Sequence, residues 1–216
     1  MLEMDKLSTS IVSESFRTLK TNIQYSSPDK KYKVIVVTSA NPGEGKTFVS
    51  SNLALTLAQG DKKVMLIDCD FRKPNIHRRF RLSNSNGLSE ILVSEKIDPS
   101  AIKSYNENLD ITTSGHMPPN PVEALASDKM CNFLEELKKD YDYVILDTPP
   151  VLFVSDAQVL STKADGTILV AKINKTKRNE IKEAYLRLKS VNANVIGTVL
   201  NGVKLESKYS YKYGGK

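Results

Sequence analysis

The stretch VIVVTSANPGEGKT, residues 34–47, decides the fold. Its first six residues are a β-branched apolar run, which is typical of a strand buried on both faces of a parallel sheet. A loop with two glycines follows, and Lys-Thr then opens FVSSNLALTLA, which predicts a helix over about 47–59. A strand, a glycine-containing loop and Lys-Thr at the start of a helix together cradle nucleotide phosphates. The stretch therefore predicts a phosphate loop.

The residue types in this loop suit the binding of a triphosphate. Gly43 and Gly45 let the backbone turn so that its N–H groups point inward at phosphate oxygens, and the helix N-terminus adds the positive end of its dipole. Lys46 is expected to reach the β- and γ-phosphates, and the Thr47 hydroxyl to bind Mg²⁺. Ala40 departs from the usual pattern, which begins with glycine. The candidate nucleotide contacts are Pro42, Gly43, Glu44, Gly45, Lys46, Thr47 and Phe48.

Similar apolar runs recur along the rest of the chain and alternate with helical patterns. Further strands are predicted at 64–68, 109–113, 143–147, 166–171 and 195–201. Further helices are predicted at about 13–24, 121–139, 156–163 and 176–191. Because this alternation requires right-handed crossovers, the sequence predicts a doubly wound α/β fold with a mainly parallel sheet. No internal repeat and no linker divides the chain.

Three aspartates stand at the predicted ends of two strands. VMLIDCDFR places Asp68 and Asp70 at the end of one strand, and YVILDTPP places Asp147 at the end of another. Ligands gather at the carboxyl ends of strands in open α/β sheets. Because residues two apart share a strand face, Asp68 and Asp70 are expected to face the same phosphate or metal, with Cys69 turned away. Asp147 stands where an acid that holds Mg²⁺ or its water is expected.

Charge is unevenly distributed along the 216 residues, whose net charge is +6. Residues 172–216 hold 11 Lys or Arg and 3 Glu, whereas the remainder holds 20 basic and 22 acidic residues. The basic last quarter suits an acidic partner, a membrane surface or nucleic acid. It equally suits a solvated helix face followed by a lysine-rich tail.

The composition argues against several other classes of protein. No apolar run approaches the roughly 20 residues that span a bilayer. The first ten residues, MLEMDKLSTS, contain no apolar signal region, so we expect no export. The two cysteines, Cys69 and Cys131, have no metal-ligand spacing, so we expect a reduced, cytosolic chain.

Together these motifs resemble the bacterial tyrosine kinases of capsule and exopolysaccharide synthesis, which are built on a P-loop ATPase of the partition and cell-division type. The three motifs of that family are present in order, as SANPGEGKT, LIDCDFR and VILDTPP. The resemblance extends to KPNIH (73–77), NGLSEIL (86–92), PPNPVEAL (118–125) and LNGV (200–203). It therefore covers nearly the whole chain, and it implies one ATP-dependent protein-tyrosine kinase domain over residues 1–204 and a flexible tail over 205–216.

The resemblance also implies roles in the in-line transfer of the ATP γ-phosphoryl group to a tyrosine hydroxyl. Lys46 and the loop amides would bind the phosphates. Thr47, Asp68 and Asp147 would hold Mg²⁺, with Asp147 acting through a water molecule.

The second motif supplies the candidates for proton transfer. Asp68 is the candidate that accepts or orients the tyrosine proton, with Asp70 in support, and the two could exchange roles. Arg72 would steady the phosphates or the tail. Asn201 resembles the asparagine that contacts adenine in related ATPases.

The predicted helix near the N-terminus, over about residues 10–25, contains ESFRTLK. This resembles the family's Glu-x-x-Arg-x-x-Arg motif, through which subunits associate into rings. Glu14 and Arg17 match the motif, whereas Lys20 replaces its last arginine, keeps the charge and loses the bidentate fork. The resemblance implies a ring-like homo-oligomer, but the same residues suit an ordinary amphipathic helix in which Glu14 and Arg17 pair.

The chain ends in YSYKYGGK, in which Tyr209, Tyr211 and Tyr213 are spaced two apart. Family members end in a tyrosine cluster that one subunit phosphorylates on another, so the resemblance implies that these three are phosphoacceptors. Three phosphates would add roughly −5 of charge and reverse the local lysine charge, which suggests electrostatic release from the neighbouring subunit. The remaining tyrosines are expected to pack within the fold: Tyr25, Tyr32, Tyr105, Tyr141, Tyr143 and Tyr185.

Short members of this family act with a separate membrane protein whose cytoplasmic tail activates the kinase. The resemblance therefore implies ATP and Mg²⁺ as cofactors and a membrane-anchored activator that regulates polysaccharide chain length. It also implies a cognate tyrosine phosphatase, protein tyrosine substrates and no nucleic-acid partner. The protein would be cytoplasmic, recruited to the inner face of the membrane, and would regulate capsular or exopolysaccharide synthesis or export.

The strongest alternative is an ATP-gated switch of the partition or septum-placement type. Such proteins carry a second lysine early in the phosphate loop, where this chain has Asn41. They have no reason to end in clustered tyrosines, and KLESKYSYKYGGK has no apolar stripe for a membrane-targeting helix. These features favour the kinase.

Overall fold

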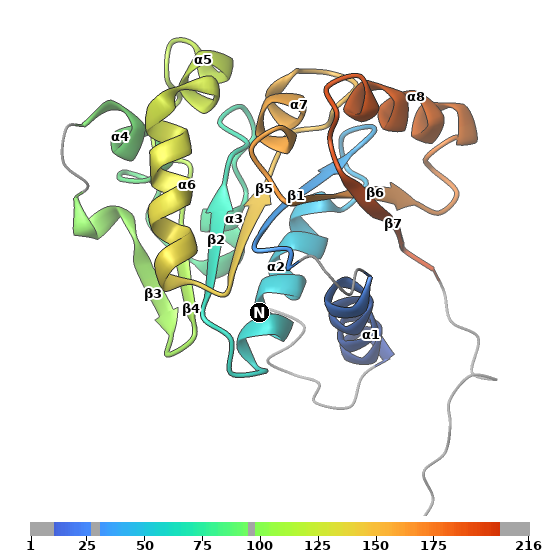
Figure 1. Ribbon diagram of the computed structural model, residues 1–216, viewed down its shortest axis with the longest axis horizontal. Helices are drawn as coiled ribbons and strands as arrows, with labels where there is room; N and C mark the ends of the chain where they lie inside the picture. Colours follow the sequence, from blue (N-terminus) through green and yellow to red (C-terminus); the bar gives the residue numbers. More distant parts are fainter. Residues whose placement is uncertain (1–10, 27–30, 95–97, 204–216) are drawn as a thin grey trace, which may run out of the picture.

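A seven-stranded sheet forms the middle layer of the fold, and helices cover both of its faces (Figure 1). The computed structural model describes residues 11–26, 31–94 and 98–203. The strands are β1 (Val34–Ser39), β2 (Val64–Asp68), β3 (Lys103–Asn106), β4 (Leu109–Thr112), β5 (Tyr143–Asp147), β6 (Gly166–Lys172) and β7 (Val195–Asn201). Their order is β3-β4-β2-β5-β1-β6-β7, and all neighbours are parallel except β3 and β4. This topology confirms the predicted doubly wound α/β fold.

The helices form two layers, one on each face of the sheet. They are α1 (Ile11–Tyr25), α2 (Lys46–Ala58), α3 (Ile76–Phe80), α4 (Leu88–Val93), the 3-10 helix η2 (Pro99–Ala101), α5 (Pro121–Ala126), α6 (Asp128–Asp140), α7 (Asp156–Ser161) and α8 (Arg178–Lys189). The apolar residues of α1, α2 and α3 pack on one face, and those of α4, α6 and α7 on the other. Helix α8 packs beside α7 and β6.

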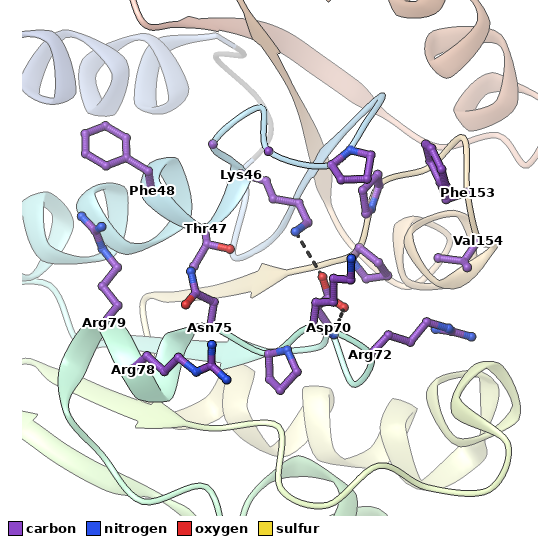
Figure 2. A pocket seen from close by; sticks show the side chains of 17 residues that line it. Lys46, Thr47, Phe48, Asp70, Arg72, Asn75, Arg78, Arg79, Phe153 and Val154 are labelled. Atoms are coloured by element: carbon purple, nitrogen blue, oxygen red, sulfur yellow. Dashed lines mark hydrogen bonds and ion pairs between the residues drawn. The ribbon is translucent and has the colours of Figure 1, made fainter.

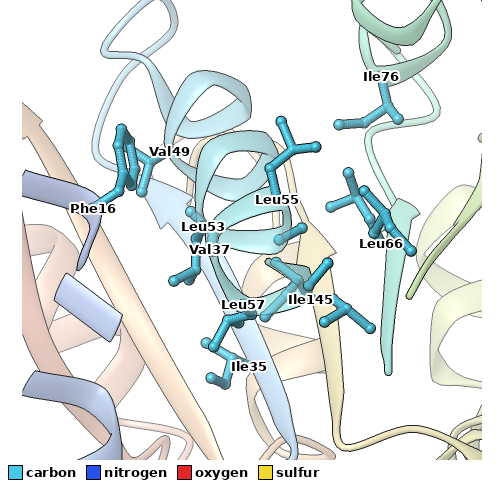
Figure 3. Packing of buried hydrophobic residues seen from close by; sticks show 14 of the residues in the cluster. Phe16, Ile35, Val37, Val49, Leu53, Leu55, Leu57, Leu66, Ile76 and Ile145 are labelled. Atoms are coloured by element: carbon cyan, nitrogen blue, oxygen red, sulfur yellow. The ribbon is translucent and has the colours of Figure 1, made fainter. Parts of the chain in front are cut away.

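Strand β1 shows how one apolar run serves both layers, since all six of its residues are buried. Ile35 and Val37 pack in the cluster that contains α2, and Figure 3 shows Val37 beside Leu53 of that helix. Val34 and Val36 pack in the cluster that contains α6. Because successive side chains of a strand point to opposite faces, a continuous apolar run suits a strand covered on both sides.

The prediction of a single helix over 121–139 is wrong, because the helix is interrupted at Ser127. Helix α5 ends at Ala126 and α6 begins at Asp128. Ser127 has an extended backbone with ψ of 155°, and its hydroxyl accepts a hydrogen bond from the Met130 N–H at 3.2 Å. A serine that caps a free N–H group in this way starts a new helix.

Periodicity in the sequence also missed four short elements, namely β3, α3, α4 and η2, which have three to six residues each. Elements of this length show too few repeats for a helical or alternating pattern to emerge. The other predicted helices and all six predicted strands are present, and their ends differ from the predicted ones by at most two residues.

No helix within the described residues is long and apolar enough to cross a membrane. The predicted tail over 205–216, with its three candidate phosphoacceptors, lies outside the described residues. Of the predicted interface helix, the described part is α1.

Three adjacent strands, β2, β5 and β1, bring the predicted site residues to one end of the sheet. Asp68 of β2 is in register with Asp147 of β5, and Asp147 is also in register with Val37 of β1. The phosphate loop leaves β1 at the same end, where parallel strands gather their carboxyl termini.

Candidate active site

The phosphate loop takes the backbone conformation that its glycines make possible. Gly43 has φ of 75° and Gly45 has φ of 98°, both in the left-handed region that side chains disfavour. Gly45 immediately precedes α2, so Lys46 and Thr47 stand in the first turn of that helix. Ala40, which replaces the usual first glycine, is buried in the cluster beside α7 and α8.

Glu44 holds the loop in shape from within the protein. Its buried carboxylate accepts hydrogen bonds from the Asn41 N–H at 2.9 Å and from the Thr176 hydroxyl at 2.5 Å. The Asn41 side chain also donates to it, at 3.4 Å. The Glu44 side chain therefore stabilises the loop itself. Its predicted contact with the nucleotide stays a prediction.

Two further side chains tie the loop to the C-terminal third of the chain. Lys175 Nζ donates to the Pro42 carbonyl at 2.8 Å, and Asn201 Nδ2 donates to the Glu44 carbonyl at 2.9 Å. Asn201 lies so close to Gly45 that a Cβ at Gly45 would be 2.0 Å from its Nδ2 atom. The amide of Asn201, predicted to contact adenine, thus contacts the loop backbone here. The sequence analysis did not predict the contacts of Lys175 and Thr176 with the phosphate loop.

Lys46 and Asp70 form an ion pair at the centre of the site (Figure 2). Lys46 Nζ lies 3.1 Å from Asp70 Oδ2, and the side chains are 14% and 4% exposed. The other Asp70 oxygen accepts the Lys73 N–H at 2.9 Å. The lysine expected to bind the phosphates therefore pairs with a carboxylate in this structure.

Thr47 and Asp147 form the second pair, in which the threonine hydroxyl donates to Asp147 Oδ2 at 2.7 Å. Burial raises the pKa of Asp147 to about 6, against the opposing effect of Lys46. Asp147 Oδ1 is buried and has no hydrogen-bond partner among the described residues. A hydroxyl and a carboxylate with a spare buried oxygen fit Mg²⁺, which takes oxygen ligands and few protein side chains.

Backbone N–H groups contact both carboxylate oxygens of Asp68. One of its oxygens accepts the Asp70 N–H at 3.1 Å, and the other accepts the N–H groups of Asn75 and Ile76 at 2.9 Å each. Burial, followed by the charge of Asp147, raises the pKa of Asp68 to about 8.

Strand β2 ends at Asp68, so alternation along the strand does not fix the direction of Asp70. That both carboxylates face the same phosphate or metal stays a prediction. Cys69 is turned away as expected and packs in the cluster that contains α6.

A cavity of about 840 Å³ joins these groups. Its volume is within the range of roughly 300–1,000 Å³ that small-molecule sites occupy. Of the predicted site residues, those that line it are Pro42, Gly43, Gly45, Lys46, Thr47, Phe48, Asp70 and Arg72. The remaining lining comes from Lys73, Pro74, Asn75, Arg78, Arg79, Pro149, Pro150, Phe153 and Val154. The other predicted site residues, Glu44, Asp68, Asp147 and Asn201, do not line it; the first three are fully buried and Asn201 is partly buried.

Arg72 is fixed at the cavity by a residue that the sequence did not single out. Its Nη1 atom lies 2.5 Å from Oδ1 of Asp156, whose side chain is fully buried in the first turn of α7. An aspartate at a helix start usually reads as a cap or first-turn residue, so its sequence position alone gave no signal for this contact.

The predicted interface helix is amphipathic, as both interpretations require. Phe16 and Ile23 are buried, and the Phe16 ring packs against that of Phe48 with centroids 5.8 Å apart. Arg17 Nη1 lies 3.1 Å from Glu14 Oε2 on the exposed side. The role of this helix in ring assembly remains a prediction.

The expected packing of the six other tyrosines is only partly correct. Tyr32, Tyr105, Tyr141 and Tyr143 are partly buried against the two main clusters. Tyr25 and Tyr185 are 79% and 43% exposed, so the expectation is wrong for them.

The chain matches the family model described as an AAA domain over residues 32–199. It is 43% identical over 207 residues to the tyrosine-protein kinase YwqD of Bacillus subtilis (strain 168), a match that covers 95% of this chain and 87% of YwqD.

Two solved structures are similar along nearly the whole chain. The kinase domain of Escherichia coli tyrosine kinase ETK is 37% identical with a TM-score of 0.88, covering 96% of this chain and 83% of that one. The chimerical protein CapA2B2 is 36% identical with a TM-score of 0.87, covering 92% of this chain and 88% of that one.

Proposed function

The chain belongs to the bacterial tyrosine-protein kinases, and on this premise we propose that it transfers the γ-phosphoryl group of ATP to the tyrosine cluster at its own residues 209–213. The proposal rests on two residue pairs at the phosphate loop, Lys46 with Asp70 and Thr47 with Asp147. Together they supply a cation for phosphates, two oxygen ligands for a metal, and a carboxylate beside the place of transfer.

Lys46 and the backbone of the loop are the proposed partners of the triphosphate. The first N–H groups of α2 have no acceptor within the helix, and the positive end of the helix dipole lies with them. Phosphate oxygens satisfy both features. Binding of ATP would draw Lys46 from Asp70 to the phosphates, which replaces one anionic partner with another and leaves the Asp70 carboxylate free.

Thr47 and Asp147 are the proposed holders of Mg²⁺, supported by the hydroxyl, the carboxylate and the spare Oδ1 atom described above. When bound, Mg²⁺ neutralises charge on the phosphate oxygens. Asp68 is aligned with Asp147, but backbone N–H groups occupy both of its oxygens, so we propose that it acts on the metal only through water.

In the proposed reaction the tyrosine oxygen forms a bond to the γ-phosphorus while the bond from that phosphorus to the β–γ bridging oxygen breaks, and ADP leaves. The phenolic proton passes to a carboxylate. Asp70 lines the cavity, whereas Asp68 is fully buried and does not line it. These positions favour Asp70 as the proton acceptor with Asp68 in support, which exchanges the two roles first expected.

Transfer between subunits, and the cellular role, belong to the same proposal. The exposed pair of Glu14 and Arg17, with Lys20 one turn further, would contact a neighbouring subunit and present its tail. We propose that a membrane-anchored partner recruits and activates the cytoplasmic kinase, and similarity to the chimerical protein CapA2B2 supports a partner chain. Control of capsular or exopolysaccharide synthesis is the proposed outcome.

The test is to incubate the purified chain with Mg²⁺ and ATP, with and without membrane extract of its host, and to map phosphorylated residues by mass spectrometry. We expect phosphate on Tyr209, Tyr211 or Tyr213, and none in the Lys46→Met variant. ATP turnover with unmodified tyrosines in both conditions would refute the proposal and favour the nucleotide-gated switch.

A further inference from the structure

One wall of the cavity carries a row of positive side chains. They come from RKPNIHRR, residues 72–79, and Figure 2 shows this segment across the cavity from Lys46. Four of its cations line the cavity: Arg72, Lys73, Arg78 and Arg79. Asp70 is the one acidic residue among the described lining residues, and it already pairs with Lys46.

Two of the four cations are engaged within the protein. Arg72 forms its ion pair with the buried aspartate of α7. The Arg79 guanidinium lies 5.0 Å from the centre of the Phe48 ring, which is a cation–π contact. Lys73 and Arg78 are exposed, and they form no ion pair with any carboxylate in the described part of the chain. These two charges are therefore available to a ligand.

The nucleotide has its own partners on the opposite wall. The triphosphate is assigned to Lys46, to Thr47 through the metal and to the loop N–H groups, so that wall already matches its charge. Lys73 and Arg78 line the same cavity, and Figure 2 shows Arg78 across it from Lys46. An acceptor tyrosine that meets the γ-phosphate would enter on this side. Cations at that place favour an acceptor that carries negative charge close to its tyrosine.

We propose that Lys73 and Arg78 bind the phosphate of a phosphotyrosine that lies two residues from the tyrosine being phosphorylated. This inference rests on the proposed function. In an extended acceptor, residues two apart lie on one face and about 7 Å from each other, so Tyr209, Tyr211 and Tyr213 have the spacing to fill both places. A phosphate brings about −1.5 to −2 of charge and binds an arginine through two parallel hydrogen bonds.

The consequence is that the first phosphate on a tail makes the next transfer easier. Residues 204–216 hold four lysines and one glutamate, so an unmodified tail meets the cationic wall with a like charge. One phosphotyrosine gives that tail an anion at the position of the two free cations. The sequence-based expectation was that each phosphate weakens the contact between the tail and the neighbouring subunit. For the first phosphates this inference predicts the reverse, namely a tighter contact.

The test measures binding of a peptide with the sequence of residues 206–216, either unmodified or phosphorylated at Tyr211, to the full chain. The chain carries Tyr209→Phe, Tyr211→Phe and Tyr213→Phe so that its own tail does not compete. Saturating Mg²⁺ and ADP keep the peptide from occupying the phosphate loop. Fluorescence anisotropy gives each dissociation constant. We expect the phosphopeptide to bind about tenfold more tightly than the unmodified peptide.

Three single variants separate this site from a general effect of charge. Arg78→Ala and Lys73→Ala are expected to remove most of the difference between the two peptides. Arg178→Ala removes an exposed arginine of α8 that does not line the cavity, and it should leave the difference unchanged. Equal affinities, or weaker binding of the phosphopeptide, would overturn the inference, and so would an advantage that Arg78→Ala leaves intact.

Failure of the proposed function would look different. The same chain, supplied with Mg²⁺ and ATP, should phosphorylate the unmodified peptide slowly and the phosphopeptide faster at low peptide concentration. If neither peptide were phosphorylated while the phosphopeptide kept its Arg78-dependent advantage in binding, the phosphotyrosine site would stand and the assignment of the tail as acceptor would fall.

Discussion

Arg72 and Asp156 form an ion pair at the edge of the cavity, with Arg72 Nη1 2.5 Å from Asp156 Oδ1. The Asp156 side chain is fully buried in the first turn of α7, whereas Arg72 lines the cavity. A charge-assisted contact to a buried carboxylate fixes the direction of the guanidinium. The pair therefore joins the second sequence motif to α7 and keeps an arginine beside the proposed place of transfer.

Asp156→Asn is expected to lower the maximal rate of phosphoryl transfer about tenfold while the KM for ATP stays the same, because Arg72 loses the charge that orients it. Arg72→Ala should have a similar effect, and the double variant should be no slower than either single variant. Initial rates at varied ATP, with melting curves for each variant, measure this. Glu183→Gln, which breaks an exposed ion pair with Arg187, is the control. Independent, additive losses would contradict the positioning role of Asp156.

Asp70→Asn and Asp68→Asn are expected to differ in their effect on transfer. Asp70→Asn removes the carboxylate at the cavity and should lower the rate about 100-fold, as for loss of a general base. Asp68→Asn should cost less, because that side chain contacts backbone N–H groups and does not line the cavity. Rates are compared at saturating ATP, with ADP affinity measured by calorimetry. A larger loss in Asp68→Asn would return the proton-acceptor role to Asp68.

The stability of the metal-free protein should depend on pH through Asp68. Its pKa is raised from 3.8 to about 8, first by burial and then by the charge of Asp147. A carboxyl whose pKa is raised on folding stabilises the fold fully below its unfolded pKa, and this contribution is lost as the pH rises through the folded pKa. The free energy of unfolding of the wild type should therefore fall relative to that of Asp68→Asn between about pH 4 and pH 8. Urea titrations in the presence of a chelator measure it, and a constant difference would argue against the raised pKa.

Thr176→Val should weaken nucleotide binding although the residue is far from the loop in sequence. Its hydroxyl donates to the buried Glu44 carboxylate at 2.5 Å, so its loss removes a charge-assisted bond worth about 1.5–3 kcal/mol. We expect a several-fold weaker affinity for ADP and a lower melting temperature. Thr162→Val is the matched control, because the Thr162 hydroxyl donates only to the Val159 carbonyl on the surface. Unchanged ADP affinity in Thr176→Val would show that Glu44 does not need this donor.

The parts of the site that follow from local chemistry were predictable from sequence. Gly43 and Gly45 are required by backbone with positive φ, and the helix that follows fixes the place of Lys46 and Thr47. Asp147 ends a continuous apolar strand, so its position at the carboxyl end of the sheet also followed.

Contacts between distant segments could not be predicted in this way. Asp156 is 84 positions from Arg72, and Thr176 is 132 positions from Glu44, so no spacing in the chain signals either contact. The backbone contacts of Asp68 were missed for a different reason, namely that their donors, Asn75 and Ile76, lie at the start of α3, a helix too short to show a pattern.

A mixing experiment tests whether this chain is a tyrosine kinase that acts on the tail of another copy. Lys46→Met has an intact tail and no competent phosphate loop, whereas the variant with phenylalanine at 209, 211 and 213 has the reverse. The two are mixed with Mg²⁺ and ATP, each also incubated alone, and tyrosine phosphorylation is mapped by mass spectrometry. We predict phosphate on Tyr209, Tyr211 or Tyr213 of Lys46→Met in the mixture only. Unmodified tail tyrosines in the mixture, or phosphate confined to exposed Tyr25, would contradict it.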